Sequence, residues 1–181
     1  MRDARDLLLS AERIYDEPSN DLQAAARAAA WRAFSGGAAW MRSAMAIVRG
    51  HCPGGRPSPE WLGACKYASA GLAAALVMAL LWRIPLLAVA AAVVTFYFVE
   101  VRMLFVFPLA LDGEPAPFLA SHRLVARTLP AGLATVRGMR IAARMLFGGF
   151  MGRGFVRSWC VGCLAVVLWY EEARKIVSVQ A

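Results

Sequence analysis

Charged side chains are scarce in this sequence, and one long stretch almost lacks them. Only 18% of the 181 residues are Asp, Glu, Lys or Arg, and 60% are hydrophobic. A soluble domain has about a quarter charged residues and about half apolar ones. Between Lys66 and Glu100 the only charged residue is Arg83. This balance is atypical of a soluble domain and favours an integral membrane protein.

Recognisable catalytic motifs are also missing. His51 and His122 are the only histidines, and the sequence has no HExxH motif, nucleophile elbow, Walker loop or paired-carboxylate motif. The glycine-rich run 148–154 follows a predicted helix, whereas a nucleotide-binding loop follows a strand. The charged start of the chain predicts no cleavable signal peptide. We therefore expect a protein without catalytic activity and without a cofactor.

Lysine is nearly absent, since Lys66 and Lys175 are the only two, so arginine carries almost all of the net charge of +8. The basic residues are spread along an apolar chain without a basic stripe interleaved with aromatics, so we do not expect nucleic acid as a partner. Basic loops on one side of a membrane explain the charge better. Abundant Arg beside Ala is typical of GC-rich bacterial coding sequences, so we expect the bacterial cytoplasmic (inner) membrane.

One long apolar stretch lies between two tryptophans. Trp61 and Trp82 are twenty-one positions apart, which is about 31 Å along a helix that rises 1.5 Å per residue. The hydrocarbon core of a bilayer is about 30 Å thick, and Trp favours its two boundaries. A second apolar run, Ile84–Leu111, follows almost at once, and Pro85 suits the first turn of its helix. The sequence therefore predicts a transmembrane helical hairpin over residues 58–112.

The arginine distribution predicts the orientation of this hairpin. Its turn contains one basic residue, Arg83, whereas residues 112–158 contain seven arginines against Asp112 and Glu114. Because basic residues collect on the cytoplasmic side, residues 112–158 and both termini are expected in the cytoplasm.

The regions that flank the hairpin read as amphipathic helices, so the predicted fold class is an all-α integral membrane protein. Residues 1–57 form three such helices, separated at 18–20 and at Gly36-Gly37, which lie on the membrane surface or pack on each other. Residues 113–181 contain a basic amphipathic helix after Pro130 and a short apolar helix over 159–170. Twelve apolar residues are too few for a span, so we expect this helix to be re-entrant or packed, with a third span as the alternative.

Arginines dominate the polar surface of the basic helix and of the segment that follows it. In the first interpretation these side chains contact anionic lipid headgroups. In the second interpretation, the basic helix is an ordinary cytoplasmic one that packs its apolar face on the N-terminal helices. The residues concerned are Arg137, Arg140, Arg144, Arg153 and Arg157.

Glu100 and Arg102 are the ionisable residues within the second predicted span. The short turn of the hairpin places Glu100 level with Tyr67 and next to Lys66. We therefore predict that Glu100 forms a structural ion pair with Lys66, or a hydrogen bond with the Tyr67 hydroxyl. The alternative is a proton or ion site.

The four cysteines include a CxxC motif, Cys160–Cys163, in addition to Cys52 and Cys65. A thioredoxin-type motif lies where a strand enters a helix, and no strand is predicted here. A zinc site would need Cys52, Cys65 or His51 to approach the motif. Packing of small apolar side chains is the preferred role, with metal binding and redox chemistry as alternatives.

Three functions follow from these patterns. The first is a non-catalytic membrane subunit or scaffold that contacts lipid and assembles with protein partners or with copies of itself. The second is a small oligomeric channel or transporter that uses Glu100 and Arg102. The third is a membrane enzyme acting on lipid or thiol substrates through Arg153, Arg157 and the CxxC motif.

Overall fold

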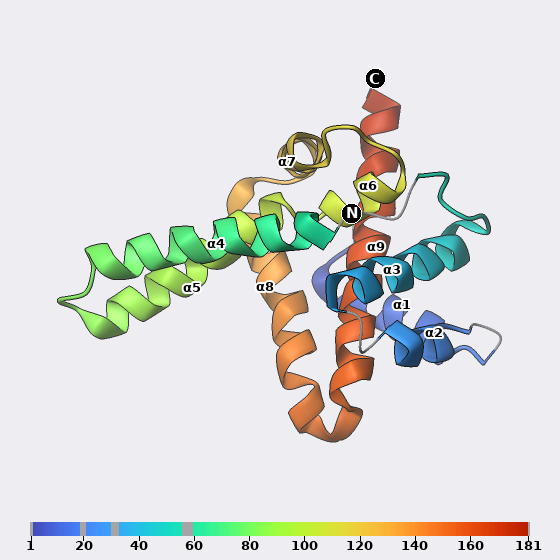
Figure 1. Ribbon diagram of the computed structural model, residues 1–181, viewed down its shortest axis with the longest axis horizontal. Coiled ribbons are helices and arrows are strands. Elements are labelled where there is room, and N and C mark those ends of the chain that lie inside the picture. Colours follow the sequence, from blue (N-terminus) through green and yellow to red (C-terminus); the bar gives the residue numbers. More distant parts are fainter. Residues whose placement is uncertain (1, 19–20, 30–32, 56–59, 181) are drawn as a thin grey trace.

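The computed structural model describes residues 2–18, 21–29, 33–55 and 60–180 (Figure 1). Within these ranges every regular element is a helix, so the predicted all-α class is confirmed for them. The helices are α1 (Ala4–Asp16), α2 (Leu22–Ala29), α3 (Ala33–Arg49), α4 (Glu60–Leu80), α5 (Pro85–Arg102), α6 (Val106–Leu111), α7 (Pro117–Thr128), α8 (Ala131–Phe147) and α9 (Phe155–Gln180), with a π-helical turn η1 (Gly149–Arg153) between the last two.

Helix α9 forms the centre of a helical body made of α1–α3 and α6–α9. It contacts α1, α2, α3, α7 and α8, and its middle section is almost completely buried, including Leu164, Trp169 and Tyr170. The apolar run 159–170 is therefore a packed segment of a longer helix, because protein surrounds most of its apolar side chains. Of the alternatives expected from the sequence, the packed helix is the one observed.

Helices α4 and α5 lie side by side and antiparallel, joined by residues 81–84, and we call residues 60–102 the arm. The arm projects from the body, crosswise to α8 and α9 (Figure 1). Glu60–Leu80 and Pro85–Leu111 are long and apolar enough to cross a membrane. Only 22% and 28% of their most apolar windows are buried, so the protein itself does not cover them as it covers α9.

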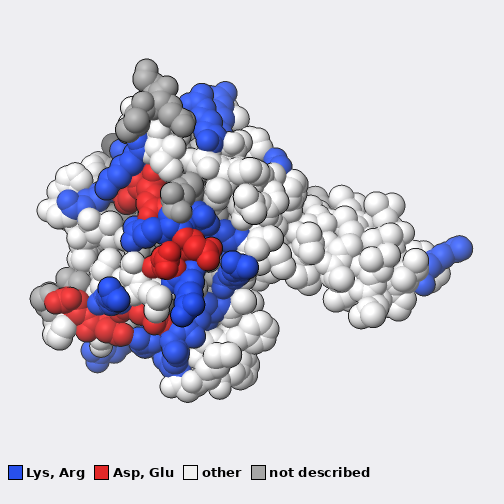
Figure 2. All heavy atoms as spheres, turned by 180° about the vertical axis from the view of Figure 1, so that it is seen from behind, with Lys and Arg blue, Asp and Glu red and all other residues white. Residues whose placement is uncertain are grey.

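The surface of the arm carries almost no charge. Lys, Arg, Asp and Glu gather on the body, whereas the arm is uncharged over most of its length and ends in a basic tip (Figure 2). That tip is Arg83, the only charged residue between Lys66 and Glu100. Large apolar side chains are exposed along both of its helices, among them Leu72, Leu76, Leu80, Leu86, Val89 and Val93.

The second apolar helix is interrupted, which the sequence analysis missed. Helix α5 ends at Arg102 and α6 begins at Val106. Pro108 has no N–H to donate to the carbonyl of Leu104, and its ring crowds that carbonyl. Ser121 of α7, a helix that was not predicted, compensates for the break. Its hydroxyl accepts from the Phe105 N–H at 3.1 Å and donates to the Arg102 carbonyl at 2.9 Å.

The three N-terminal helices pack against the rest of the body through their apolar faces. Leu7 and Ala11 of α1 are fully buried, and α1 contacts both α8 and α9. The predicted break at Gly36-Gly37 is wrong, because both glycines lie inside α3, where Gly36 is buried and packing offsets its low helix propensity. The predicted boundary at 57/58 lies outside the described residues.

Candidate functional site

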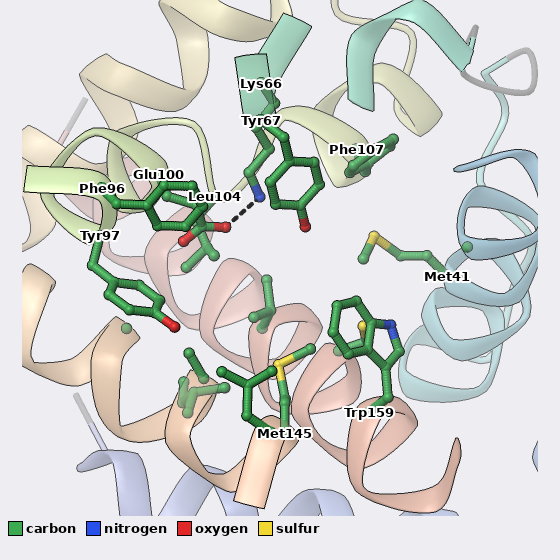
Figure 3. Close-up of a pocket in the computed structure, with 17 residues that line it drawn as sticks. Met41, Lys66, Tyr67, Phe96, Tyr97, Glu100, Leu104, Phe107, Met145 and Trp159 are labelled. Carbon is green, nitrogen blue, oxygen red and sulfur yellow. Dashed lines mark ion pairs between the residues drawn. The ribbon is translucent and has the colours of Figure 1, made fainter. Parts of the chain in front are cut away.

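A cavity of about 630 Å³ lies where the arm joins the body (Figure 3). Helices α3, α4, α5, α6, α8 and α9 all contribute to its lining. Most of the lining is apolar and includes Met41, Phe96, Leu104, Phe107, Met145 and Trp159. A concave, mainly apolar cavity with a few polar groups is the usual form of a small-molecule site.

An ion pair between the two arm helices lies in the wall of this cavity. The Lys66 Nζ and Glu100 Oε1 atoms are 2.6 Å apart, and the two side chains are only 5% and 12% exposed. The Lys66 ammonium also lies 5.2 Å from the centroid of the Tyr67 ring. The structure therefore brings together the three residues that the hairpin register grouped. A charge this buried needs a partner of opposite sign, and Lys66 and Glu100 serve as partners for each other.

Arg102 is separated from this cavity. Its guanidinium carbon lies 4.2 Å from the centroid of the Phe98 ring, and its side chain lines a smaller pocket of about 110 Å³ that also contains His122. The structure therefore places Glu100 and Arg102 in the linings of two different cavities.

The arginines of the α8–α9 region lie mostly against acidic residues of α1. Arg144 and Arg153 both pair with Glu12, Arg157 pairs with Asp16 at 2.5 Å, and Arg140 lies 3.6 Å from Asp3. The arginine-bearing side of α8 therefore faces α1, whereas the second interpretation placed the apolar face of this helix on the N-terminal helices.

Arg137 has a different environment from the other four arginines. Its guanidinium carbon lies 5.1 Å from the centroid of the Trp169 ring. Its buried Nη1 has no hydrogen-bond partner among the described residues. Burial lowers the pKa of Arg137.

The cysteines do not form a metal site within the described residues, where no group of three His, Cys, Asp or Glu could hold an ion. Cys160 is buried, Cys163 borders the cavity, and Cys52 and Cys65 are exposed. Burial raises the pKa of Cys160 and Cys163 to about 12, so both thiols stay protonated at neutral pH. A protonated thiol is neither a good nucleophile nor a metal ligand, so the environment favours packing.

A polar cluster that the sequence did not reveal connects three distant segments. Arg49 of α3 contacts both oxygens of Asp112, at 2.6 and 2.9 Å, and Glu171 at 2.6 Å. The Tyr170 hydroxyl donates to Asp112 at 2.6 Å, and Arg174 contacts it at 2.9 Å. Burial opposes ionisation of Asp112, but the hydrogen bonds from Arg49 and Tyr170 and the nearby arginine charges outweigh it and lower its pKa.

This cluster predicts an acid-dependent loss of stability. The pKa of Asp112 is lower in the folded state than in the unfolded state. The stability that Asp112 contributes is therefore fully present above its unfolded pKa of about 3.9, and it is lost as the pH falls through its folded-state pKa. Asp112→Asn should reduce the free energy of unfolding at pH 7 by about 2 kcal/mol. It should also make this free energy change less as the pH is lowered. Thermal unfolding in detergent across this range measures both. Glu17→Gln, at an exposed position, is the control, and an equal loss in both variants would contradict the assignment.

Comparison of the chain with protein-family models, curated proteins and solved structures found no match.

Proposed function

We propose that the protein is a membrane-anchored subunit without catalytic activity of its own. In this proposal the arm crosses the bilayer twice, and the helical body stays at the cytoplasmic surface, where it assembles with protein partners or with copies of itself. The observation that carries the proposal is the exposed apolar surface of the arm. Each square ångström of such surface in contact with water costs about 25 cal/mol, so an arm of this length needs lipid or protein around it.

The charge distribution supports this arrangement. Charged residues gather on the body, and the far end of the arm has a single basic residue (Figure 2). The Arg83 guanidinium carbon lies 5.6 Å from the centroid of the Trp82 ring, and the Trp82 side chain is 69% exposed. Trp is enriched at membrane–water boundaries, and its ring attracts a nearby cation. By the positive-inside rule the arginine-rich body is then cytoplasmic, in the inner membrane of a bacterium.

Contact of the body with lipid remains part of the proposal. The turn between α8 and α9 exposes Phe147, Phe150 and Phe155. Helices α8 and α9 run crosswise to the arm (Figure 1). If the arm crosses the membrane, these two helices lie parallel to the membrane surface. Arg140 and Arg153 keep 62% and 44% of their side-chain surface exposed beside their ion pairs, so they are available to headgroup phosphates.

Support for assembly comes from one face of α4. Small side chains recur there at helical spacing and are exposed at positions Ala64, Ala68, Ala75 and Ala79. In lipid, small residues at such spacing let two helices approach closely, and the contacts are then made by backbone and neighbouring side chains.

Ala75→Leu tests this assembly. Its larger side chain should hold neighbouring helices apart and reduce self-association in vesicles, measured as energy transfer between copies labelled with donor and acceptor dyes. The control is Ala90→Leu, the same change at an exposed position of α5. Energy transfer that is equal in the two variants and in the unchanged protein would contradict self-association through this face.

A further inference from the structure

We infer that the cavity at the root of the arm binds one hydrocarbon chain of a membrane lipid, with an uncharged polar group of that lipid beside Lys66 and Glu100. This inference rests on the proposed insertion of the arm. The volume of about 630 Å³ lies within the range of about 300–1,000 Å³ that is usual for ligand sites.

The walls of the cavity match a hydrocarbon chain. Phe96 and Leu104 lie on the arm side, Phe107 is contributed by α6, and Met145 and Trp159 face them from α8 and α9 (Figure 3). Aromatic and methionine side chains adapt to a flexible apolar ligand without needing polar contacts.

The rim of the cavity continues into surface that the proposal places in lipid. Leu146 and Trp159 line the cavity and are still 48% and 47% exposed. Next to them, Phe147 and Phe155 extend the apolar surface toward the α8–α9 turn. A chain can therefore enter from the bilayer without leaving apolar surroundings.

The polar groups in the cavity select against a net charge. The Lys66 ammonium is already neutralised by Glu100, 2.6 Å away, so an anionic group would meet no unbalanced positive charge. The Tyr97 side chain directs its hydroxyl into the cavity (Figure 3). A tyrosine hydroxyl can donate a hydrogen bond to the ester carbonyl of a lipid chain, which only accepts.

The test uses the full-length protein in nanodiscs that contain a phosphatidylcholine with a photoactivatable diazirine on one acyl chain. After illumination, the modified residues are identified by mass spectrometry. Met41 and Val166 line the cavity but are only 8% and 7% exposed, so lipid that merely coats the arm does not reach them. Ala142→Trp fills the cavity, and Ala143→Trp on the next residue of α8, which is exposed and does not line it, is the matched control.

We expect adducts on Met41 and Val166 in the unchanged protein and in Ala143→Trp, and their loss in Ala142→Trp. If Ala142→Trp fails to fold, Leu146→Trp at the exposed rim should produce the same loss. Adducts confined to the arm surface would overturn the lipid site and leave the anchor intact, whereas no adducts anywhere would overturn the anchor itself. Labelling by anionic phosphatidylglycerol alone would also overturn the assignment, because the site is neutral.

Discussion

Arginine placed in the middle of the arm, by Leu72→Arg together with Val93→Arg, is expected to abolish stable insertion into membranes. Both side chains are exposed, by 65% and 45%, so neither substitution disturbs packing within the protein. If lipid surrounds the arm, each arginine costs about 2.5–3.5 kcal/mol near the centre of a span. If water surrounds the arm, the same changes remove exposed apolar surface and do no harm.

The measurement is the fraction of full-length protein that stays with bacterial membranes after an alkaline carbonate wash. Leu119→Arg places the same residue at a position of α7 that is 49% exposed on the body, and it should remain with the membranes. A double variant that is retained as well as this control contradicts an arm that crosses the bilayer.

Glu100→Gln is expected to cause the largest loss of stability among single substitutions. It leaves the Lys66 ammonium buried without its partner, and breaking a buried ion pair costs about 3–5 kcal/mol. Lys66→Met should be similarly harmful, because it strands the Glu100 carboxylate. The double variant, Lys66→Met with Glu100→Gln, should recover most of the loss, since it leaves neither charge unpaired.

Thermal unfolding of the four proteins in detergent measures this coupling. Recovery in the double variant identifies a structural ion pair. A Glu100→Gln protein that keeps its stability but loses ion or proton flux in liposomes would contradict the structural ion pair. It would support the alternative, a proton or ion site at Glu100.

The arrangement of the arm helices follows from local sequence features, and this made its central contact predictable. Pro85 and the short connection after Trp82 set the register of two antiparallel helices, which places Glu100 beside Lys66. The break before Val106 was predictable in part, because Pro108 identifies a weak point. The compensating hydroxyl of Ser121 was not, since it belongs to a helix with no strong apolar pattern.

The packing of the body depends on pairs that are distant in sequence. Helical periodicity predicts that the α8 arginines lie on one side of the helix. It does not predict whether lipid phosphates or protein carboxylates contact them. Glu12 and Asp16, one turn apart on α1, were a usable signal, because they complement Arg153 and Arg157.

The cavity has no local signature in the sequence. It forms where six helices meet, and its lining residues extend from Gly37 to Val166. The Asp112 cluster is similar, because its arginine partners Arg49 and Arg174 lie more than sixty positions away on either side.

Chemical labelling of the arm tip tests the membrane crossing most directly. Arg83→Cys, in a chain whose native cysteines are replaced by alanine, is treated in intact bacterial cells with a maleimide that cannot cross the inner membrane. Glu17→Cys on the body is the matched position. We predict that the cysteine at 83 reacts in intact cells and that the cysteine at 17 reacts only after the membrane is permeabilised. Equal reactivity of both positions, or reaction at 83 only after permeabilisation, would contradict an arm that reaches the outer side of the membrane.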